Sequence, residues 1–293
     1  MILKGIFAAL TSVFNEDLSL DIKSTINHAF DVVKNGSNVA FLGSTSQAQL
    51  ISVSEKTKLI EKLGENNFQK NCLIGTGCNS LKENINLMKH SIKNGFDKFL
   101  LMNPAYYKNT DEGVYNFYDN IIQQVPDSKI ILYNFSTLSG YTFSADVVRK
   151  LVSDFPKNIV GMKDSTGNLF DNLKISDFSM FVGSEIQLLK ALELGCVGCI
   201  SATTNVTHSL ARKVYDDFIN KRKQTVNEKL CTIRKIFDDS GDLISAVHSF
   251  MSEEDVRYKR ILPPLTLLSL EKRIELLHKL KQLDFVPKKN MAA

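Results

Sequence analysis

Tryptophan is absent from the 293-residue sequence, and proline and cysteine are scarce, with six and five residues. Five is an odd number of cysteines, and in a chain of this length it gives no disulfide framework. Cys196 and Cys199 form a CxxC pair, but neither a second CxxC nor a nearby pair of histidines completes a zinc site. We therefore interpret both as buried strand cysteines, which act as small hydrophobic residues.

Long apolar runs and an excess of one charge are also missing. No stretch approaches the ~20 apolar residues that a membrane span needs, and residues 1–18 lack the charged start and cleavage site of a signal peptide. Lysine and arginine number 36 against 32 acidic residues, and this net charge of +4 is spread along the chain. We expect a cytoplasmic protein that binds neither nucleic acid nor a membrane.

Short apolar runs alternate with amphipathic stretches at a period of roughly 25–30 residues. Each run is bounded by Gly, Asn, Pro or Ser and is short enough for a strand that is buried on both faces. No linker rich in proline, glycine or serine interrupts the alternation. The runs that we predict to be strands are 5–10, 39–43, 72–76, 99–102, 130–134, 159–162, 180–183 and 197–201.

The intervening stretches have helical spacing of their apolar residues, as in 21–35, 54–63, 80–94 and 110–125. Eight strand–helix units predict an α/β protein, a (β/α)8 TIM barrel over 1–222. The remaining residues, 223–293, are expected to form helices packed on the barrel. A doubly wound open sheet is the competing layout, but the Gly-Thr-Gly at 75–77 lacks the third glycine of its usual fingerprint.

The residues that follow the strands matter most, because the chemistry of such a barrel gathers at the carboxyl ends of its strands. These positions are rich in hydroxyl groups and contain no histidine, so metal-assisted hydrolysis and a Ser-His-Asp triad have little support. The five histidines fall mostly in predicted helices, where we interpret them as surface or packing residues.

Lys163 ends a run of residues that should be buried, and a buried lysine is costly unless its amine is neutral or paired. A desolvated amine is the usual nucleophile for a Schiff base with a carbonyl substrate. The alternative is a structural bridge from Lys163 to Asp164 or Glu185. Tyr133 ends the preceding strand and should lie beside Lys163, where its phenol could relay a proton; it could also be an ordinary half-buried strand tyrosine.

Five motifs give the chain a resemblance to a known family. They are GSTSQ at 43–47, YNFSTLSG at 133–140, GMKDSTGN at 161–168, GCISATTN at 198–205 and LPPL at 262–265. In this order and spacing the chain resembles the dihydrodipicolinate synthase/N-acetylneuraminate lyase family. The resemblance implies a TIM barrel, usually a homotetramer, in which a lysine condenses with pyruvate or releases it without cofactor or metal.

The resemblance also assigns roles by matched position. Lys163 matches the Schiff-base lysine, and Tyr133 matches the proton-relay tyrosine. Ser44 and Thr45 match the hydroxyl pair that binds the pyruvyl carboxylate and orients that tyrosine. Tyr106, by its spacing to Gly113, matches the tyrosine that is lent across the dimer interface. Ile200 matches the residue whose backbone lines the pyruvyl pocket.

Departures from the family pattern concern the second substrate. Leu138 occupies the position where synthases of the family carry an arginine that grips the carboxylate of aspartate semialdehyde. This resembles the branch of lyases and 2-keto-3-deoxy-sugar-acid aldolases. The loop 43–47 has Ser-Gln where the pattern has Gly-Glu, and the acidic pair after the seventh strand keeps one carboxylate, Glu185. Ser165, Glu185 and Thr203 are candidates to bind sugar hydroxyls.

We therefore expect a class I lyase that cleaves a 2-keto-3-deoxy sugar acid or N-acetylneuraminate to pyruvate and an aldehyde. The first alternative is 4-hydroxy-tetrahydrodipicolinate synthase, which condenses pyruvate with aspartate semialdehyde. The second is a binding barrel without catalysis, which would have no need for a buried amine.

Overall fold

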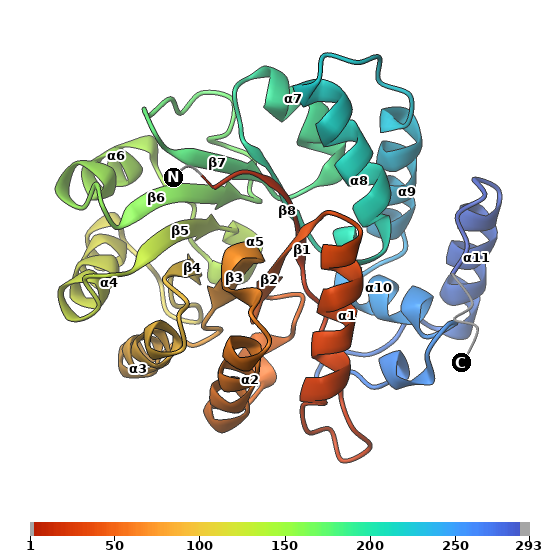
Figure 1. Cartoon of the computed structure of the whole chain (residues 1–293), viewed down its shortest axis with the longest axis horizontal. Coiled ribbons are helices and arrows are strands. Elements are labelled where there is room, and N and C mark those ends of the chain that lie inside the picture. Colours follow the sequence, from red (N-terminus) through yellow and green to blue (C-terminus); the bar gives the residue numbers. More distant parts are fainter. Residues whose placement is uncertain (1–2, 288–293) are drawn as a thin grey trace.

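The computed structural model describes residues 3–287. Eight parallel strands pair in chain order, and the eighth closes on the first to give a barrel, as Figure 1 shows. The predicted (β/α)8 TIM barrel is therefore confirmed. The strands are β1 Gly5–Ala9, β2 Asn38–Phe41, β3 Cys72–Gly75, β4 Lys98–Met102, β5 Lys129–Asn134, β6 Ile159–Asp164, β7 Ser179–Val182 and β8 Gly198–Ser201.

Helices surround the barrel, and several of them begin where the sequence supplies a capping side chain. Ser52 and Glu55 form a capping box at the second helix, so this helix begins at Val53, one residue before the serine at 54 that opens the predicted stretch. Thr110 likewise accepts a bond from the backbone of Gly113. The helices are α1 Ile22–Lys34, α2 Val53–Glu65, α3 Leu81–Lys93, α4 Asp111–Gln124, α5 Ser136–Ser139, α6 Ala145–Asp154, α7 Leu188–Glu193, α8 Thr204–Ile219, α9 Asn227–Asp239, α10 Leu243–Met251 and α11 Leu270–Lys281.

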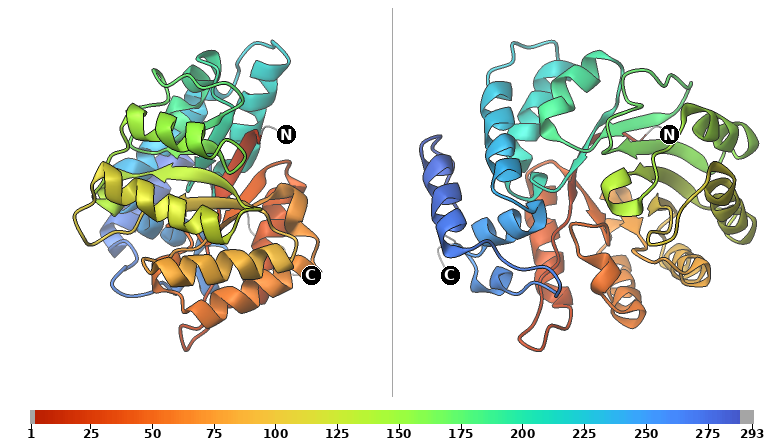
Figure 2. Two further views of the ribbon diagram at one scale, coloured as in Figure 1. Left: turned by 90° about the vertical axis from the view of Figure 1, so that its left-hand side faces the viewer. Right: turned by 180° about the vertical axis from the view of Figure 1, so that it is seen from behind.

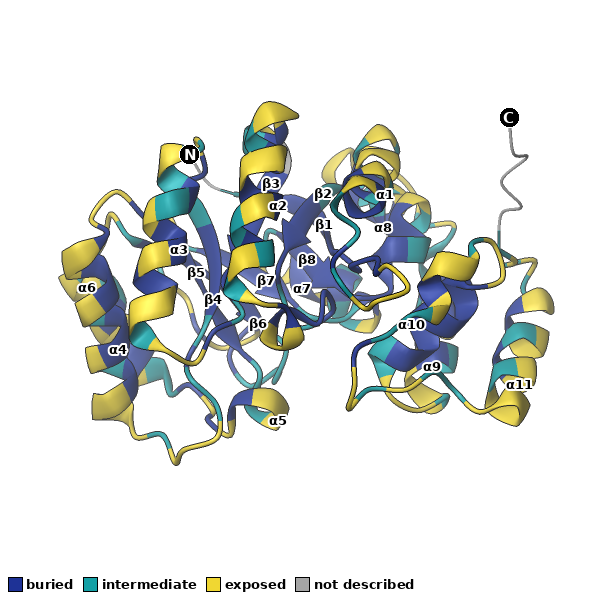
Figure 3. Cartoon of the chain, turned by 90° about the horizontal axis from the view of Figure 1, so that it is seen from below, coloured by how far each residue is buried: buried dark blue, intermediate teal, exposed yellow. Residues whose placement is uncertain are grey.

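Side chains alternate between the inside of the barrel and the helix layer, because successive residues of a strand point to opposite faces. The outward set packs against the inner faces of the helices and forms the largest core. Figure 3 shows the strands buried, whereas the helices expose only their outer faces. The inward set is a smaller cluster that includes Tyr133 and Ile200. Lys163 pairs with Tyr133 on one side and Phe181 on the other, so it belongs to the inward set.

The C-terminal helices form a second core beside the barrel. α8 ends at Ile219 and α9 begins at Asn227, on either side of the predicted boundary at 222. Phe237, Val247, Phe250 and Leu276 are buried together there. In Figure 1 and in the back view of Figure 2, α11 lies farther from the strands than α9 and α10 do. The division into 1–222 and 223–293 stays a prediction, and its ends lie outside the described residues.

Within residues 3–287, no helix is long and apolar enough to cross a membrane.

Candidate active site

Tyr133 and Lys163 lie side by side at the carboxyl ends of β5 and β6. Their Cα atoms are partners in the parallel pairing of the two strands. The Lys163 Nζ lies 4.1 Å from the centre of the Tyr133 ring. Both side chains are buried, with 4% of each exposed. An amine held in this way against an aromatic face is largely out of water, as the imine chemistry of a lysine nucleophile requires.

The two carboxylates that could have bridged to Lys163 have other partners. Asp164 accepts bonds from the Asn134 amide and from the backbone N–H groups of Gly167, Leu169 and Phe170. Glu185 pairs with Arg234. Within residues 3–287, Lys163 takes part in no ion pair. The structural-bridge alternative is therefore wrong, because the candidate partners are already satisfied.

The loop after β2 brings hydroxyl groups to the same end of the barrel. Ser44 Oγ lies 3.1 Å from the Tyr133 hydroxyl, within hydrogen-bond distance. Thr45 is buried next to it, and Ile200 lies inside the barrel on β8. Either hydroxyl can be the donor in this hydrogen bond. Ser44 is therefore close enough to exchange a proton with the Tyr133 phenol. Ser44 thus contacts the hydroxyl of Tyr133, and Lys163 contacts the face of its ring.

Tyr106 has an unusual backbone and an unusual exposure. Its φ is +83°, in the left-handed region that a bulky residue rarely adopts. Its ring is 91% exposed and stands edge-on to Tyr107, which is 80% exposed. Tyr106 is not among the residues that line the cavity beside Tyr133. The role of Tyr106 in the site of a neighbouring subunit stays a prediction.

A cavity of about 260 Å³ opens beside the Tyr133 ring. Leu138, on α5, lines it with 44% of its side chain exposed. Ile244 at the start of α10, together with Pro264 and Leu265, lines it from the C-terminal region. From the sequence, LPPL at 262–265 was used only as a family motif, and Ile244 was not predicted to lie at the site. No local pattern identifies these residues, since their place at the cavity depends on how the C-terminal region packs.

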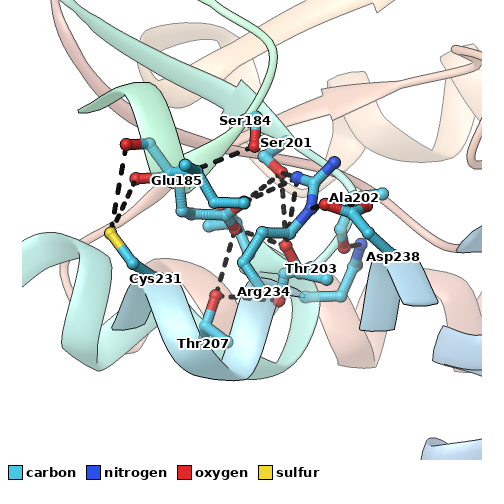
Figure 4. A network of polar contacts seen from close by, with 12 residues as sticks. Ser184, Glu185, Ser201, Ala202, Thr203, Thr207, Cys231, Arg234 and Asp238 are labelled. Carbon is cyan, nitrogen blue, oxygen red and sulfur yellow. Dashed lines mark hydrogen bonds and ion pairs between the residues drawn. The ribbon is translucent and has the colours of Figure 1, made fainter. Parts of the chain in front are cut away.

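Glu185 and Thr203 lie in a buried network of polar contacts, which Figure 4 shows. Neither residue lines the cavity beside Tyr133. Glu185 is fully buried and accepts bonds from Ser201 and Thr203 at 2.6 Å each. Thr204 and Thr207 donate to the same carboxylate. Internal donors thus occupy the Glu185 carboxylate, and both side chains are shielded from solvent. A role for Glu185 and Thr203 in binding sugar hydroxyls stays a prediction.

Arg234 on α9 completes this network, and sequence reasoning missed it. Its guanidinium donates to Glu185 and to Ser201 at 2.8 Å each. Burial by itself raises the pKa of Glu185, but Arg234 and the hydroxyl donors together hold the pKa below its ordinary value. An arginine on an amphipathic helix gives no sign of such a partner, so the sequence carried no signal for it.

Ser165 is half-buried and follows β6. It lies against Gly183, where any Cβ would clash with its side chain. A role in binding substrate hydroxyls stays a prediction for this residue.

Gln47 replaces the acidic residue of the family loop, and it has a structural task. Its Oε1 accepts a bond from the Leu262 backbone, and its Nε2 lies 3.1 Å from His248 Nε2. The Tyr258 carbonyl can only accept, so His248 Nδ1 carries the proton and Nε2 accepts from Gln47. Burial lowers the pKa of His248 to about 4, which keeps the ring neutral. Gln47 thus ties the loop after β2 to the C-terminal region.

Among residues 3–287, no group of three or more His, Cys, Asp or Glu side chains could hold a metal ion. The expectations of no metal and no cofactor stay predictions.

Comparisons with known proteins agree with this geometry. The model of the dihydrodipicolinate synthetase family matches residues 2–283. A 4-hydroxy-tetrahydrodipicolinate synthase of Pelagibacter ubique is 34% identical over 259 residues, which cover 85% of this chain and 83% of that protein. A DapA-like lyase of Thermococcus kodakarensis, described as uncharacterized, is 28% identical over 90% of this chain and 94% of its own.

Solved structures lead to the same family. The dihydrodipicolinate synthase of Aquifex aeolicus superposes with a TM-score of 0.88 at 26% identity, covering 98% of this chain and 100% of its own. The synthase of Acinetobacter baumannii, solved with pyruvate, gives 0.86 at 28% identity, with coverage of 97% and 99%. The chain therefore belongs to the dihydrodipicolinate synthetase family, and it is a pyruvate-dependent carbon–carbon lyase of the class I aldolase type.

Proposed function

We propose that Lys163 forms an imine with the carbonyl carbon of pyruvate, and that this imine makes or breaks a bond to an aldehyde. The observation that carries this proposal is the buried Lys163 amine against the Tyr133 ring, with the Tyr133 hydroxyl bonded to Ser44. A protonated imine draws electrons from the neighbouring carbon, which can then lose a proton and become an enamine nucleophile. In this proposal Tyr133 carries that proton, and Ser44 and Thr45 hold the carboxylate of pyruvate.

Aspartate semialdehyde is the first candidate for the aldehyde. The named relatives are mostly 4-hydroxy-tetrahydrodipicolinate synthases, and they support this condensation better than cleavage of a sugar acid. The condensation with aspartate semialdehyde, which was the first alternative in the sequence analysis, therefore comes before the cleavage of a sugar acid, which the sequence favoured.

Cleavage of a 2-keto-3-deoxy acid is the second candidate, and Leu138 is the observation that favours it. A leucine offers no donor to the carboxylate of aspartate semialdehyde, whereas arginine can bind a carboxylate through two parallel bonds. N-acetylneuraminate is the weaker substrate within this group, because Glu185 and Thr203 are occupied inside the protein.

We also propose a homotetramer in which Tyr106 is lent to a neighbouring site. The exposed, strained Tyr106 supports this role, since a contact with a second subunit would bury its ring. We also propose that the protein is located in the cytoplasm.

Reduction with borohydride in the presence of pyruvate tests the imine. We expect a reduced three-carbon adduct on the peptide that contains Lys163, and no adduct in Lys163→Ala. Lys56 is the matched control, because it is also buried and its burial lowers its pKa, yet it donates to the backbone of Gly77. Lys56→Arg should keep the adduct. An adduct on Lys56, or none, would overturn the proposal, and none would favour a binding barrel.

A further inference from the structure

The loop between β2 and residue 48 carries Ser44 and has a left-handed backbone near both of its ends. The φ angle is +56° at Leu42 and +58° at Gln47. Residues other than glycine rarely keep this conformation unless contacts with the rest of the protein hold them in it. The Gln47 N–H donates to the Ser44 carbonyl at 2.9 Å. This turn links the place of Ser44 to the place of Gln47.

The side chain of Gln47 is held at both of its polar atoms by the C-terminal region. It is 3% exposed, and its Oε1 accepts from the Leu262 N–H at 2.7 Å. Its Nε2 lies 3.1 Å from Nε2 of His248, on α10. His248 is itself held by the Tyr258 carbonyl, 3.0 Å from its Nδ1. The two anchors of Gln47 therefore come from residues that lie 201 and 215 positions later in the chain.

Donors and acceptors allow this amide only one orientation. With its oxygen and nitrogen exchanged, Gln47 would turn its NH2 group to the Leu262 N–H and its oxygen to the lone pair of His248 Nε2. The arrangement also needs an uncharged His248, since a proton on Nε2 would oppose the NH2 group. His28 and Tyr258 are the titratable residues that act on this ring. A charge on His28 would lower the pKa of His248 further, and burial raises the pKa of Tyr258, so neither favours a charged ring.

We propose that Gln47 is a positioning residue of the reaction: anchored by Leu262 and His248, it holds the Ser44 hydroxyl within reach of Tyr133. This inference rests on the proposed imine at Lys163, with Tyr133 as its proton carrier. Gln47 acts through Ser44, whose Oγ lies 3.1 Å from the Tyr133 hydroxyl. Without its anchors the loop can shift, and the contact that serves the proton transfer lengthens while the barrel remains folded. The C-terminal region thereby contributes to the reaction without touching the reacting atoms.

Exchange of the C3 hydrogens of pyruvate with deuterium from the solvent measures this proton transfer, because it needs the imine and a proton carrier but no aldehyde. Proton NMR follows the exchange. Gln47→Met keeps a similar volume and removes both side-chain bonds, and we expect it to lower kcat/KM for exchange roughly 10- to 100-fold, the scale of a misplaced group. Gln123→Met is the matched control and should be close to wild type, since Gln123 is exposed near the end of α4. A wild-type rate in Gln47→Met would overturn the inference.

A double-mutant cycle with Ser44→Ala separates positioning from a general loss of structure. If Gln47 acts through the Ser44 hydroxyl, Gln47→Met has nothing left to misplace in the Ser44→Ala background, and it should change kcat/KM there by less than about twofold. A damaged fold would instead lower the rate by the same factor in both backgrounds, and that result would contradict the inference. Circular dichroism checks that each variant is folded.

Gln47→Glu tests the contact with His248. A carboxylate cannot donate, so it repels the lone pair of a neutral His248 unless the two side chains take up one proton between them. The rate of Gln47→Glu relative to wild type should therefore fall as the pH rises from about 5 to 8, the range in which histidine titrates. Adding His248→Gln should rescue Gln47→Glu, because the amide introduced at 248 can donate to the carboxylate across this range. A ratio that does not change with pH in Gln47→Glu would rule out the role of His248.

Borohydride trapping keeps this inference apart from the proposed function. Gln47→Met should still give the reduced pyruvate adduct on Lys163, since the amine is unchanged. No adduct in wild type would overturn the imine itself. An adduct in wild type, together with equal effects of Gln47→Met in both backgrounds, would overturn only the positioning role.

Discussion

Glu185 and Arg234 form a buried ion pair that joins the barrel to the C-terminal helices. The Glu185 carboxylate, in the short helix Glu185–Gln187 after β7, lies 2.8 Å from the guanidinium on α9. The same guanidinium bonds Ser201 at the end of β8, one residue after Ile200. The pair therefore fixes the carboxyl end of β8, where Ile200 lines the interior, relative to the C-terminal helices, among them α10 with Ile244.

Breaking this pair should destabilise the whole protein. Glu185→Gln leaves the Arg234 charge buried with Asp238 as its remaining acidic partner, and removing one partner of a buried pair costs about 3 kcal/mol or more. Urea denaturation measures the difference from wild type. The control is Glu275→Gln, whose exposed pair with Lys279 should leave the unfolding midpoint unchanged. Equal midpoints for wild type and Glu185→Gln would refute a stabilising role.

The same pair predicts the pH dependence of stability. Because the folded protein holds the pKa of Glu185 below its ordinary value of 4.5, the unfolded chain takes up the proton first as the pH falls. The stabilisation is present above pH 4.5 and is lost as the pH falls through the lowered pKa. The difference in the free energy of unfolding between wild type and Glu185→Gln should thus stay constant from about pH 7 to pH 5 and shrink below about pH 4.5. A difference that shrinks near neutral pH would contradict this assignment.

Tyr133→Phe should lower kcat by roughly 10²–10⁴-fold, the usual effect of losing a positioned proton carrier. It removes only the hydroxyl that bonds Ser44, so the barrel should remain folded. Tyr118→Phe is the matched control, because it removes a buried hydroxyl that bonds the Leu101 backbone away from the site. A near-normal rate for Tyr133→Phe would show that another group moves the proton.

Light scattering should show a tetramer, and activity should depend on a tyrosine from another subunit. Tyr106→Phe and Lys163→Ala should each be impaired, yet mixed after dissociation and reassembly they should regain about a quarter of wild-type activity, since random pairing restores one intact site in every mixed dimer. Tyr107→Phe serves as the control and should be close to wild type. A fully active monomer, or no recovery in the mixture, would rule out the exchange of Tyr106.

Leu138→Arg should increase the use of aspartate semialdehyde about tenfold or more, because a guanidinium can pair with its carboxylate. The measurement is kcat/KM for condensation with pyruvate, with Leu138→Met as the control. If wild type already reaches the ~10⁴ M⁻¹s⁻¹ typical of a true substrate, Leu138 does not exclude the synthase reaction. In that case the first candidate is the function.

Local sequence patterns determined the barrel. Each strand of the barrel corresponds to a short apolar run that can be found without knowledge of its neighbours, and capping residues mark the helices between them. The closeness of Tyr133 and Lys163 followed in the same way, because consecutive parallel strands pair and their carboxyl ends meet at one edge.

Tertiary structure alone decided what surrounds the reacting groups. Glu185 was expected to face substrate, but its partner Arg234 lies 49 residues later on a helix whose docking no periodicity reveals. The cavity beside Tyr133 likewise combines Leu138 on α5 with Ile244 on α10 and Leu265 in the segment before α11. Periodicity reports which face of an element is buried, whereas the partner of a buried charge and the lining of a cavity depend on packing between elements distant in sequence.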